Sequence, residues 1–171
     1  MSKDNASVLV TGGAGFVGSH TVLALKEAGF SPIVYDNYST GHRDAVFSDD
    51  CVEGDVFDKS LLVKTLREYN VSSVIHFAAL IEAGHSVVDP LSFYRNNVAA
   101  SICLFEAMQE VGVERLVFSS TAAVYGYRDF DDALHESLPV APINPYGKTK
   151  AVVEGILADL ALGSPLNSIA L

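Results

Sequence analysis

The sequence has few positive charges and only two cysteines. Its 171 residues include 11 Lys and Arg against 21 Asp and Glu, a formal net charge of −10, and no run of basic residues. An acidic chain without a basic stripe cannot neutralise a phosphate backbone, which argues against a nucleic-acid partner. Cys51 and Cys103 stand in apolar stretches, without the paired spacing of a zinc site or a disulfide framework. We predict two buried thiols, no metal site and a reducing, cytoplasmic compartment.

Long apolar runs are absent as well. No stretch reaches the roughly 18 apolar residues of a membrane span, and residues 1–6 lead into a short apolar segment without a signal-like profile. These features predict a soluble chain without a membrane partner. With 49% hydrophobic residues, the chain is long enough to fold as one domain with a sizeable core.

What the sequence does have is a regular alternation of short β-branched runs and longer segments with helical spacing, which is typical of repeated βαβ units. Predicted strands cover 8–11, 33–36, 51–55, 74–78 and 115–119, and predicted helices cover 16–28, 60–69, 91–111 and 146–162. We expect an α/β fold with a doubly wound parallel sheet (Rossmann-like), in which Gly29 and Gly112 stop two helices. A new apolar run at Ser168 predicts a sixth strand that is cut short.

The segment 125–145 differs from its surroundings. Acidic residues at 129, 131, 132 and 136 are followed by prolines at 139, 142 and 145. This composition predicts a long loop. Such a loop is either a lid or binding loop over a site, or an acidic solvated connector.

A glycine-rich turn lies between the first predicted strand and the first predicted helix. Residues 11–18 read Thr-Gly-Gly-Ala-Gly-Phe-Val-Gly, so Gly12, Gly15 and Gly18 are spaced three apart. Gly13, Gly15 and Gly18 also fit the pattern G-x-G-x-x-G. Glycine allows a tight turn and a close approach of the backbone to a pyrophosphate, whose charge the helix N-terminus would hold. In this context the motif predicts a dinucleotide site.

Asp36 lies 18 residues beyond Gly18, at the end of the second predicted strand. A carboxylate at this place accepts hydrogen bonds from a ribose 2′-hydroxyl and repels a 2′-phosphate, which favours NAD over NADP. Asp55 and Phe77–Ala79 close the next two predicted strands. Because ligands bind outside the carboxyl ends of parallel strands, these residues are further candidates for the same pocket.

Tyr146 and Lys150 are four residues apart at the start of the last predicted helix and therefore share one of its faces. An ammonium beside a phenol stabilises the phenolate, so this pair suits proton transfer with Tyr146 as the base. Residues 119–121, Ser-Ser-Thr, come at the end of the fifth predicted strand, where a hydroxyl can reach a substrate oxygen.

Together these features resemble the extended short-chain dehydrogenase/reductase family and, within it, the nucleotide-sugar 4-epimerases. The matching segments are 11–20, 36–37, 39–43, 53–55, 74–79, 96–97, 118–126 and 145–150. The resemblance implies a tightly held NAD. It assigns as cofactor-binding residues Gly12, Gly15, Phe16, Val17, Gly18, Asp36, Asn37, Ser39, Thr40, Gly41, Asp55, Val56, Phe77, Ala78, Ala79, Asn96, Ser119, Tyr146 and Lys150.

The same resemblance implies catalysis by Thr121, Tyr146 and Lys150 on a UDP-hexose, with Thr121 and Tyr146 contacting the substrate. Tyr146 would remove the 4-hydroxyl proton while the C4 hydride passes to NAD. The 4-keto sugar would then turn over and take the hydride back on its other face, which inverts C4 without net oxidation. Thr121 would hydrogen-bond the 4-oxygen.

Departures from relatives with other chemistry favour an epimerase. Dehydratases carry an Asp-Glu pair after the Ser or Thr, and decarboxylating relatives carry a Glu at the second position, whereas this chain has Ala122 and Ala123. Alanine transfers no proton. Ile81 stands where some members place a lysine. We expect His76, Glu82 and His85 to be satisfied or solvated side chains outside the chemistry.

The chain is shorter than epimerases of this type. We therefore expect residues 1–171 to form an incomplete NAD-binding domain, with the C-terminal substrate domain absent, weak or absent activity, and exposed apolar sheet surface. The resemblance also implies a homodimer through helices 91–111 and 146–162.

Two alternative functions use part of the same residue set. A non-catalytic NAD-binding module would need the glycine turn and Asp36 but not Thr121, Tyr146 and Lys150. A reductase of small carbonyl compounds would use Tyr146 and Lys150 but release NADH. The residues leave UDP-glucose and N-acetylated sugars both open as substrates.

Overall fold

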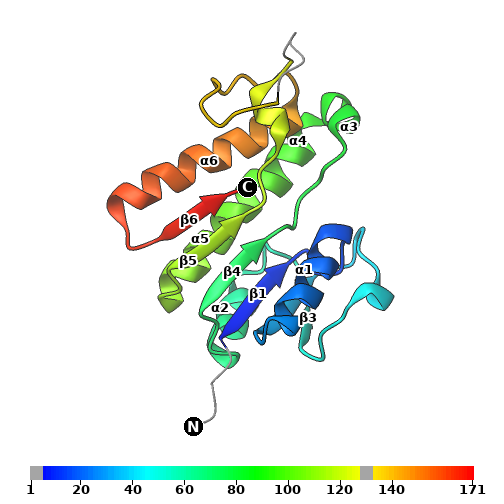
Figure 1. The fold of residues 1–171 in the computed structure, drawn as a ribbon, viewed down its shortest axis with the longest axis vertical. Coiled ribbons are helices and arrows are strands. Elements are labelled where there is room, and N and C mark those ends of the chain that lie inside the picture. The colour runs from blue at the N-terminus through cyan, green and yellow to red at the C-terminus, as the bar shows by residue number, and fades with distance from the viewer. Residues whose placement is uncertain (1–5, 128–132) are drawn as a thin grey trace.

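The computed structural model describes residues 6–127 and 133–171, which form a six-stranded parallel sheet in the order β3-β2-β1-β4-β5-β6 (Figure 1). The strands are β1 Ser7–Thr11, β2 Ser31–Asp36, β3 Cys51–Glu53, β4 Ser73–His76, β5 Arg115–Phe118 and β6 Asn167–Ala170. The chain runs outward from β1 to β3, crosses back, and runs outward again from β4 to β6. This order confirms the predicted doubly wound sheet.

Helices cover the two faces of this sheet unequally. Those described are α1 Phe16–Glu27, α2 Lys59–Glu68, α3 Ala83–Val88, α4 Pro90–Phe93, α5 Ala100–Val111 and α6 Pro145–Gly163, with the 3-10 helices η1 Arg43–Ala45 and η3 Ala122–Tyr125 and the π-helix η2 Tyr94–Ala99. The main core joins one sheet face to α2, α5 and α6 through side chains such as Leu66, Leu104 and Leu157. On the other face, Val22 of α1 packs against β1 and β2. Within residues 6–127 and 133–171, no helix has the length and apolar character needed to cross a membrane.

The central strand β1 shows how the sequence produces these layers. Leu9 belongs to the main core, while Val8 and Val10 point to the opposite face beneath α1. All three are at most 3% exposed. A strand buried on both faces needs apolar residues at successive positions, which is why the run Val-Leu-Val shows no polar alternation.

Several predicted boundaries are wrong. β3, β4 and β5 end one or two residues before the predicted ends, because the chain turns there to line a pocket. The helix predicted over 91–111 consists of α4, η2 and α5 in succession. The short helix α3 was not predicted. Gly29 and Gly112, both with positive φ, follow α1 and α5 as expected.

The predicted long loop at 125–145 is described only in part. Residues 133–144 contain no helix or strand. Positions 129, 131 and 132, three of the four acidic positions that marked the loop, lie outside the described residues, as do residues 1–5.

The prediction of two buried thiols is also wrong. Cys51 is exposed on β3, which lies at the edge of the sheet. Cys103 is half-buried on α5, and its thiol donates to the carbonyl oxygen of Phe57 at 3.4 Å. Burial raises the pKa of the Cys103 thiol. An apolar sequence neighbourhood does not by itself bury a side chain at the edge of the sheet or at the margin of the core.

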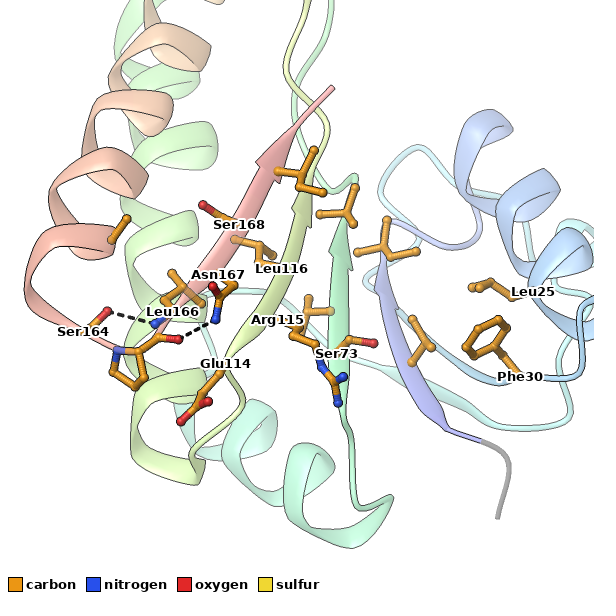
Figure 2. Close-up of a pocket in the computed structure, with 17 residues that line it drawn as sticks. Leu25, Phe30, Ser73, Glu114, Arg115, Leu116, Ser164, Leu166, Asn167 and Ser168 are labelled. Carbon is orange, nitrogen blue, oxygen red and sulfur yellow. Dashed lines mark hydrogen bonds between the residues drawn. The ribbon is translucent and has the colours of Figure 1, made fainter. Parts of the chain in front are cut away.

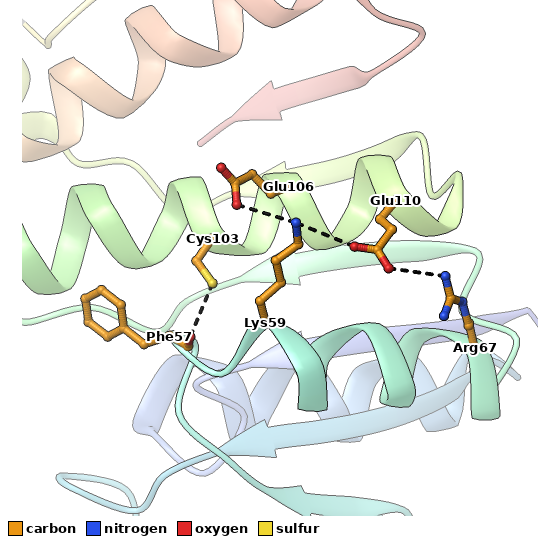
Figure 3. Close-up of polar contacts among 6 residues, drawn as sticks. All are labelled: Phe57, Lys59, Arg67, Cys103, Glu106 and Glu110. Atoms are coloured by element: carbon orange, nitrogen blue, oxygen red, sulfur yellow. Dashed lines mark hydrogen bonds and ion pairs between the residues drawn. The ribbon is translucent and has the colours of Figure 1, made fainter.

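Ion pairs join α2 to α5 on the outer surface (Figure 3). Lys59 lies 3.6 Å from Glu106 and 3.5 Å from Glu110, and Arg67 lies 3.3 Å from Glu110. The four side chains are all roughly half exposed, so water screens them and each pair contributes at most about 1 kcal/mol. The apolar side chains beneath them provide most of the stabilisation.

One face of β4, β5 and β6 has no helix over it in the described part of the chain. An in-register row of Val34, Val10, Ile75, Val117 and Ile169 crosses five strands. The first two are fully buried beneath α1, the next two are half-buried, and Ile169 is 61% exposed. A hollow of about 990 Å³ lies over this part of the sheet. Figure 2 shows the residues that line it. The expected exposed apolar sheet surface is therefore present.

This row allows a matched test of the layer arrangement. Val10→Ala should lower the free energy of unfolding by about 2 kcal/mol, because it opens a cavity beneath α1. Val117→Ala, the same change on the open half of the row, should cost less than about 1 kcal/mol. Urea unfolding followed by circular dichroism measures both. Equal losses would contradict the unequal cover of the two halves.

Candidate functional site

A pocket of about 390 Å³ lies at the carboxyl end of the sheet, between the turns that follow the strands and the start of α6. Every residue predicted to bind the cofactor lines this pocket: Gly12, Gly15, Phe16, Val17, Gly18, Asp36, Asn37, Ser39, Thr40, Gly41, Asp55, Val56, Phe77, Ala78, Ala79, Asn96, Ser119, Tyr146 and Lys150. Lining residues that were not predicted are Tyr35, Gly54, Leu80, Ile81, Glu82 and Ala100. Most of these are sequence neighbours of predicted residues at strand ends, and that adjacency is the signal that could have found them.

The glycine turn forms the floor of the pocket. Gly12 has φ +70°, and a Cβ there would lie 2.7 Å from the amide nitrogen of Ala78 at the end of β4. A Cβ at Gly18 would collide with the carbonyl oxygen of Gly12. Backbone segments therefore pack directly against each other at Gly12 and Gly18, and any larger residue at either position would force them apart.

The N-terminus of α1 opens onto this floor. Its N-cap is Gly15, no side chain caps it, and its first turn contains no acidic residue. Phe16 is 82% exposed and Val17 56% exposed, although both are large and apolar. The first N–H groups of a 12-residue helix are thus available to an anion in the pocket.

Asp36 fixes the far rim. Its Oδ2 accepts a hydrogen bond from the amide of Ala14 at 2.9 Å, and its Oδ1 accepts one from the amide of Tyr38 at 2.8 Å. Asn37 donates to Oδ2 of Asp55 at 2.9 Å. These bonds hold two carboxylates at the rim, and each carboxylate keeps capacity to accept further hydrogen bonds from a ligand.

Tyr146 and Lys150 lie on the opposite side, at the start of α6. Asn144 caps this helix by accepting from the amide of Gly147 at 2.8 Å, and the hydroxyl of Ser86 in α3 accepts from the amide of Tyr146 at 3.1 Å. Lys150 is buried, and its Nζ donates to the carbonyl of Ser119 at 2.8 Å. Burial lowers the pKa of Lys150 to about 8, which leaves the side chain mostly protonated at neutral pH. The cation is therefore held in place within the pocket wall.

The π-helix η2 contains two consecutive asparagines with different surroundings. Asn96 lines the pocket, whereas Asn97 is only 2% exposed. The Asn97 side chain accepts from the amide of Leu80 at 2.8 Å and donates to the Leu80 carbonyl at 2.9 Å and to Thr149 at 3.2 Å. Thr149 in turn donates to the Tyr146 carbonyl at 2.7 Å. Asn97 thus links the loop after β4 to the helix that carries Tyr146.

His76 is fully enclosed behind this wall. Its Nδ1 lies 2.6 Å from the hydroxyl of Thr11 and its Nε2 lies 3.0 Å from the hydroxyl of Ser101, which donates to the Asn97 carbonyl at 2.6 Å. Because the Ser101 proton is used there, Nε2 of His76 donates and Nδ1 accepts from Thr11. Burial, aided by the charge of Lys150, lowers the pKa of His76 to about 3. The hydrogen bonds at both ring nitrogens confirm the prediction that His76 is a satisfied side chain.

Thr121 is the predicted site residue that the structure does not place in the pocket wall. It is half-buried just beyond β5, and its Oγ1 accepts from the amide of Ala123 at 3.2 Å, which caps η3. Glu82, expected to be solvated, is exposed but lines the pocket. Among residues 6–127 and 133–171, no group of three or more His, Cys, Asp or Glu side chains is arranged to hold a metal ion.

Comparison with known proteins gives consistent matches. Residues 8–169 match the family described as "NAD dependent epimerase/dehydratase family". The UDP-glucose 4-epimerase of Rhizobium leguminosarum bv. trifolii is 47% identical over 165 residues, covering 96% of this chain and 50% of that protein. The crystal structure of UDP-glucose 4-epimerase from Brucella ovis in complex with NAD has a TM-score of 0.93 at 45% identity, covering 96% of this chain and 50% of that one.

A second solved structure extends this comparison. The UDP-glucose 4-epimerase from Bifidobacterium longum in complex with NAD+ and UDP has a TM-score of 0.90 at 34% identity. The match covers 96% of this chain and 52% of that one. The chain therefore spans about half the length of the relatives it matches.

The buried cation at Lys150 has a testable titration. Its Nζ should lose a proton with a midpoint near pH 8 in the folded chain and near the ordinary value of 10.5 in urea, because burial disfavours the charged form only when the chain is folded. Side-chain NMR of labelled lysine measures both midpoints, and Lys150→Met, which lacks the signal, assigns it. An ordinary midpoint in the folded chain would contradict the enclosed position.

Proposed function

The chain belongs to the NAD dependent epimerase/dehydratase family, and from this premise we propose that it binds NAD and carries the proton-transfer residues of a UDP-hexose 4-epimerase. The observation that carries the proposal is that three features line one pocket. The glycine turn, the carboxylate of Asp36 and the pair of Tyr146 and Lys150 all line the same cavity of about 390 Å³. None of these features is sufficient alone, and together they match what a nicotinamide cofactor and a sugar hydroxyl require.

The residues present fit NAD. The backbone floor at Gly12 and the open N-terminus of α1 suit a pyrophosphate, near Phe16 and Val17. Asp36 and Asn37 would hold the adenosine ribose, and Asp55 and Val56 the adenine. The nicotinamide half would lie toward the wall formed by Phe77, Ala78, Ala79, Asn96, Ser119, Tyr146 and Lys150. A carboxylate at the ribose end supports NAD rather than NADP.

When bound, NAD supplies the acceptor and donor for a hydride at the sugar C4. Tyr146 takes the proton from the 4-hydroxyl and returns it at the end of the cycle. Lys150, protonated at neutral pH and fixed by the Ser119 carbonyl, stabilises the phenolate of Tyr146. Thr121 accepts a hydrogen bond from the Ala123 amide, so its hydroxyl proton is available for the sugar 4-oxygen.

The residues beside Thr121 support epimerisation over elimination or decarboxylation. Those reactions need an acid or a base next to the Ser or Thr, and Ala122 and Ala123 offer neither. The two helical residues lie in η3, directly after Thr121. Reversible transfer of one proton and one hydride is the chemistry that remains for this residue set.

The length of the chain indicates which part of the relatives it corresponds to. Because it covers about half of its relatives, we propose that residues 1–171 form the NAD-binding domain and that the contacts with the uridine and the sugar 2-position belong to the part of the relatives that it does not span. The two cysteines, neither in a disulfide, suit the reducing cytoplasm in which we place the protein.

We test the proposal by nucleotide content and turnover. The purified chain should contain bound NAD, released by denaturation and identified by mass spectrometry. Any conversion of UDP-galactose to UDP-glucose should fall at least about 100-fold in Tyr146→Phe, because the base is lost. Tyr127→Phe, a change at a tyrosine that is 75% exposed, is the matched control.

Three other results have distinct meanings. Bound NAD without turnover would indicate an NAD-binding half that requires the part of the relatives that this chain does not span, and would leave the cofactor-binding module as the alternative. Accumulation of NADH with a carbonyl substrate would support a reductase. Absence of both nucleotide and turnover would overturn the dinucleotide site itself.

We also propose a homodimer that pairs α5 and α6 of two copies. Ile102 on α5 is 39% exposed and Val152 on α6 is 42% exposed, and α6 is apolar on several sides. Exposed aliphatic residues on two long helices suit a helix-bundle interface.

This interface predicts a dimer in sedimentation velocity. Ile102→Glu with Val152→Glu should convert it to a monomer, because a bundle interface cannot bury unpaired carboxylates. Ile169→Glu, which places a charge on the open sheet face instead, should leave the dimer intact. A monomeric wild-type chain, or a dimer lost only with Ile169→Glu, would count against the proposed helices.

A further inference from the structure

An arginine at the rim beyond Asp36 has no part in the chemistry above. Arg43 begins η1, two residues after Gly41 in the pocket wall. Its guanidinium lies 4.1 Å from the centre of the Tyr38 ring, and its Nη2 donates to the carboxylate of Glu53 at 2.5 Å. Both the flat face and one edge of the guanidinium are therefore bound to the protein.

Glu53 holds this arginine close to the ribose end of the pocket. Glu53 is the register partner of Asp36 on the neighbouring strand, and adjacent strands lie about 4.8 Å apart. Tyr38, the stacking partner of Arg43, donates its amide to Asp36 at 2.8 Å. The carboxylate that would meet the ribose 2′-oxygen thus binds the amide of Tyr38, whose ring lies against a guanidinium that a second carboxylate already binds.

The loop that makes these contacts contains a non-glycine residue with positive φ. Tyr38 has φ +56°, in the left-handed region that a bulky side chain rarely enters. Such a residue persists only where its surroundings fix it. The Asp36 carboxylate fixes its amide and Arg43 covers its ring. The loop and the ion pair therefore form one unit.

We propose that Glu53 is a cofactor-specificity residue: by binding Arg43, it keeps this cation from a ribose 2′-phosphate and so reinforces the exclusion of NADP by Asp36. An arginine near this position is the usual partner of a 2′-phosphate in NADP sites, where it binds in a bidentate, charge-assisted manner. Here the arginine is present, but its guanidinium is bound to Glu53 and stacked on Tyr38. The inference rests on the proposed NAD site and adds a second residue to its selectivity.

Exposure sets the size of the effect. The side chains of Arg43 and Glu53 are 63% and 60% exposed, so water screens their attraction. Release of an arginine from an exposed ion pair corresponds to about a fivefold change in an equilibrium constant. Asp36 remains in place and continues to oppose a phosphate, so the preference should weaken rather than reverse.

The test compares NAD and NADP binding to the 171-residue chain, freed of nucleotide, by isothermal titration calorimetry. Glu53→Gln should lower the Kd for NADP about fivefold, because Arg43 becomes free, and should leave the Kd for NAD within about twofold. The further change Arg43→Met should remove that gain. Glu68→Gln, which neutralises an exposed carboxylate at the end of α2, is the matched control for net charge.

Each outcome decides the point. A selective gain in Glu53→Gln that depends on Arg43 supports the role. An unchanged NADP to NAD ratio, an equal gain in Glu68→Gln, or a gain that survives the loss of Arg43 overturns it while NAD binding stands. A chain that binds neither nucleotide overturns the proposed function and this inference together.

Discussion

The close approach of the turn after β1 to the end of β4 is the constraint on which the pocket depends. At Gly12 a Cβ would meet the backbone of Ala78, and at Gly18 it would meet the carbonyl of Gly12. Because this floor is made of backbone, N–H groups rather than side chains face the cavity, and α1 can begin at the floor itself. Every other wall is positioned relative to this contact, since β1 is central and pairs with both β2 and β4.

Behind the wall, two buried groups that can carry positive charge coexist because one of them is neutral. His76 has a pKa lowered to about 3 by burial and by Lys150, and it uses its single ring proton toward Ser101. A second cation at this place would oppose the charge of Lys150. The neutral imidazole instead joins β1, β4 and α5 through its two ring nitrogens. Lys150 thus keeps its charge without repulsion from a protonated His76 behind it.

Local motifs made the sheet and most of the pocket predictable. Glycine spacing, strand periodicity and the rule that ligands bind at carboxyl ends predict that residues such as Asp36 and Lys150 line one pocket, and both do, because each prediction depends on a short segment and on one topological fact. What they miss depends on tertiary contacts. The π-helix that buries Asn97, the partial burial of Cys103 at the margin of the core and the offset of Thr121 from the pocket wall are set by neighbours distant in sequence.

The strand order also has a kinetic meaning. β2 adds to β1 and β3 adds to β2, and after the crossover β4 adds to the other side of β1, followed by β5 and β6. No strand is inserted between two that precede it in the chain. A polypeptide that emerges from the ribosome N-terminus first can therefore extend a template edge with each new strand, and no earlier pairing has to be undone. The strand order thus allows sheet growth to follow the order of synthesis.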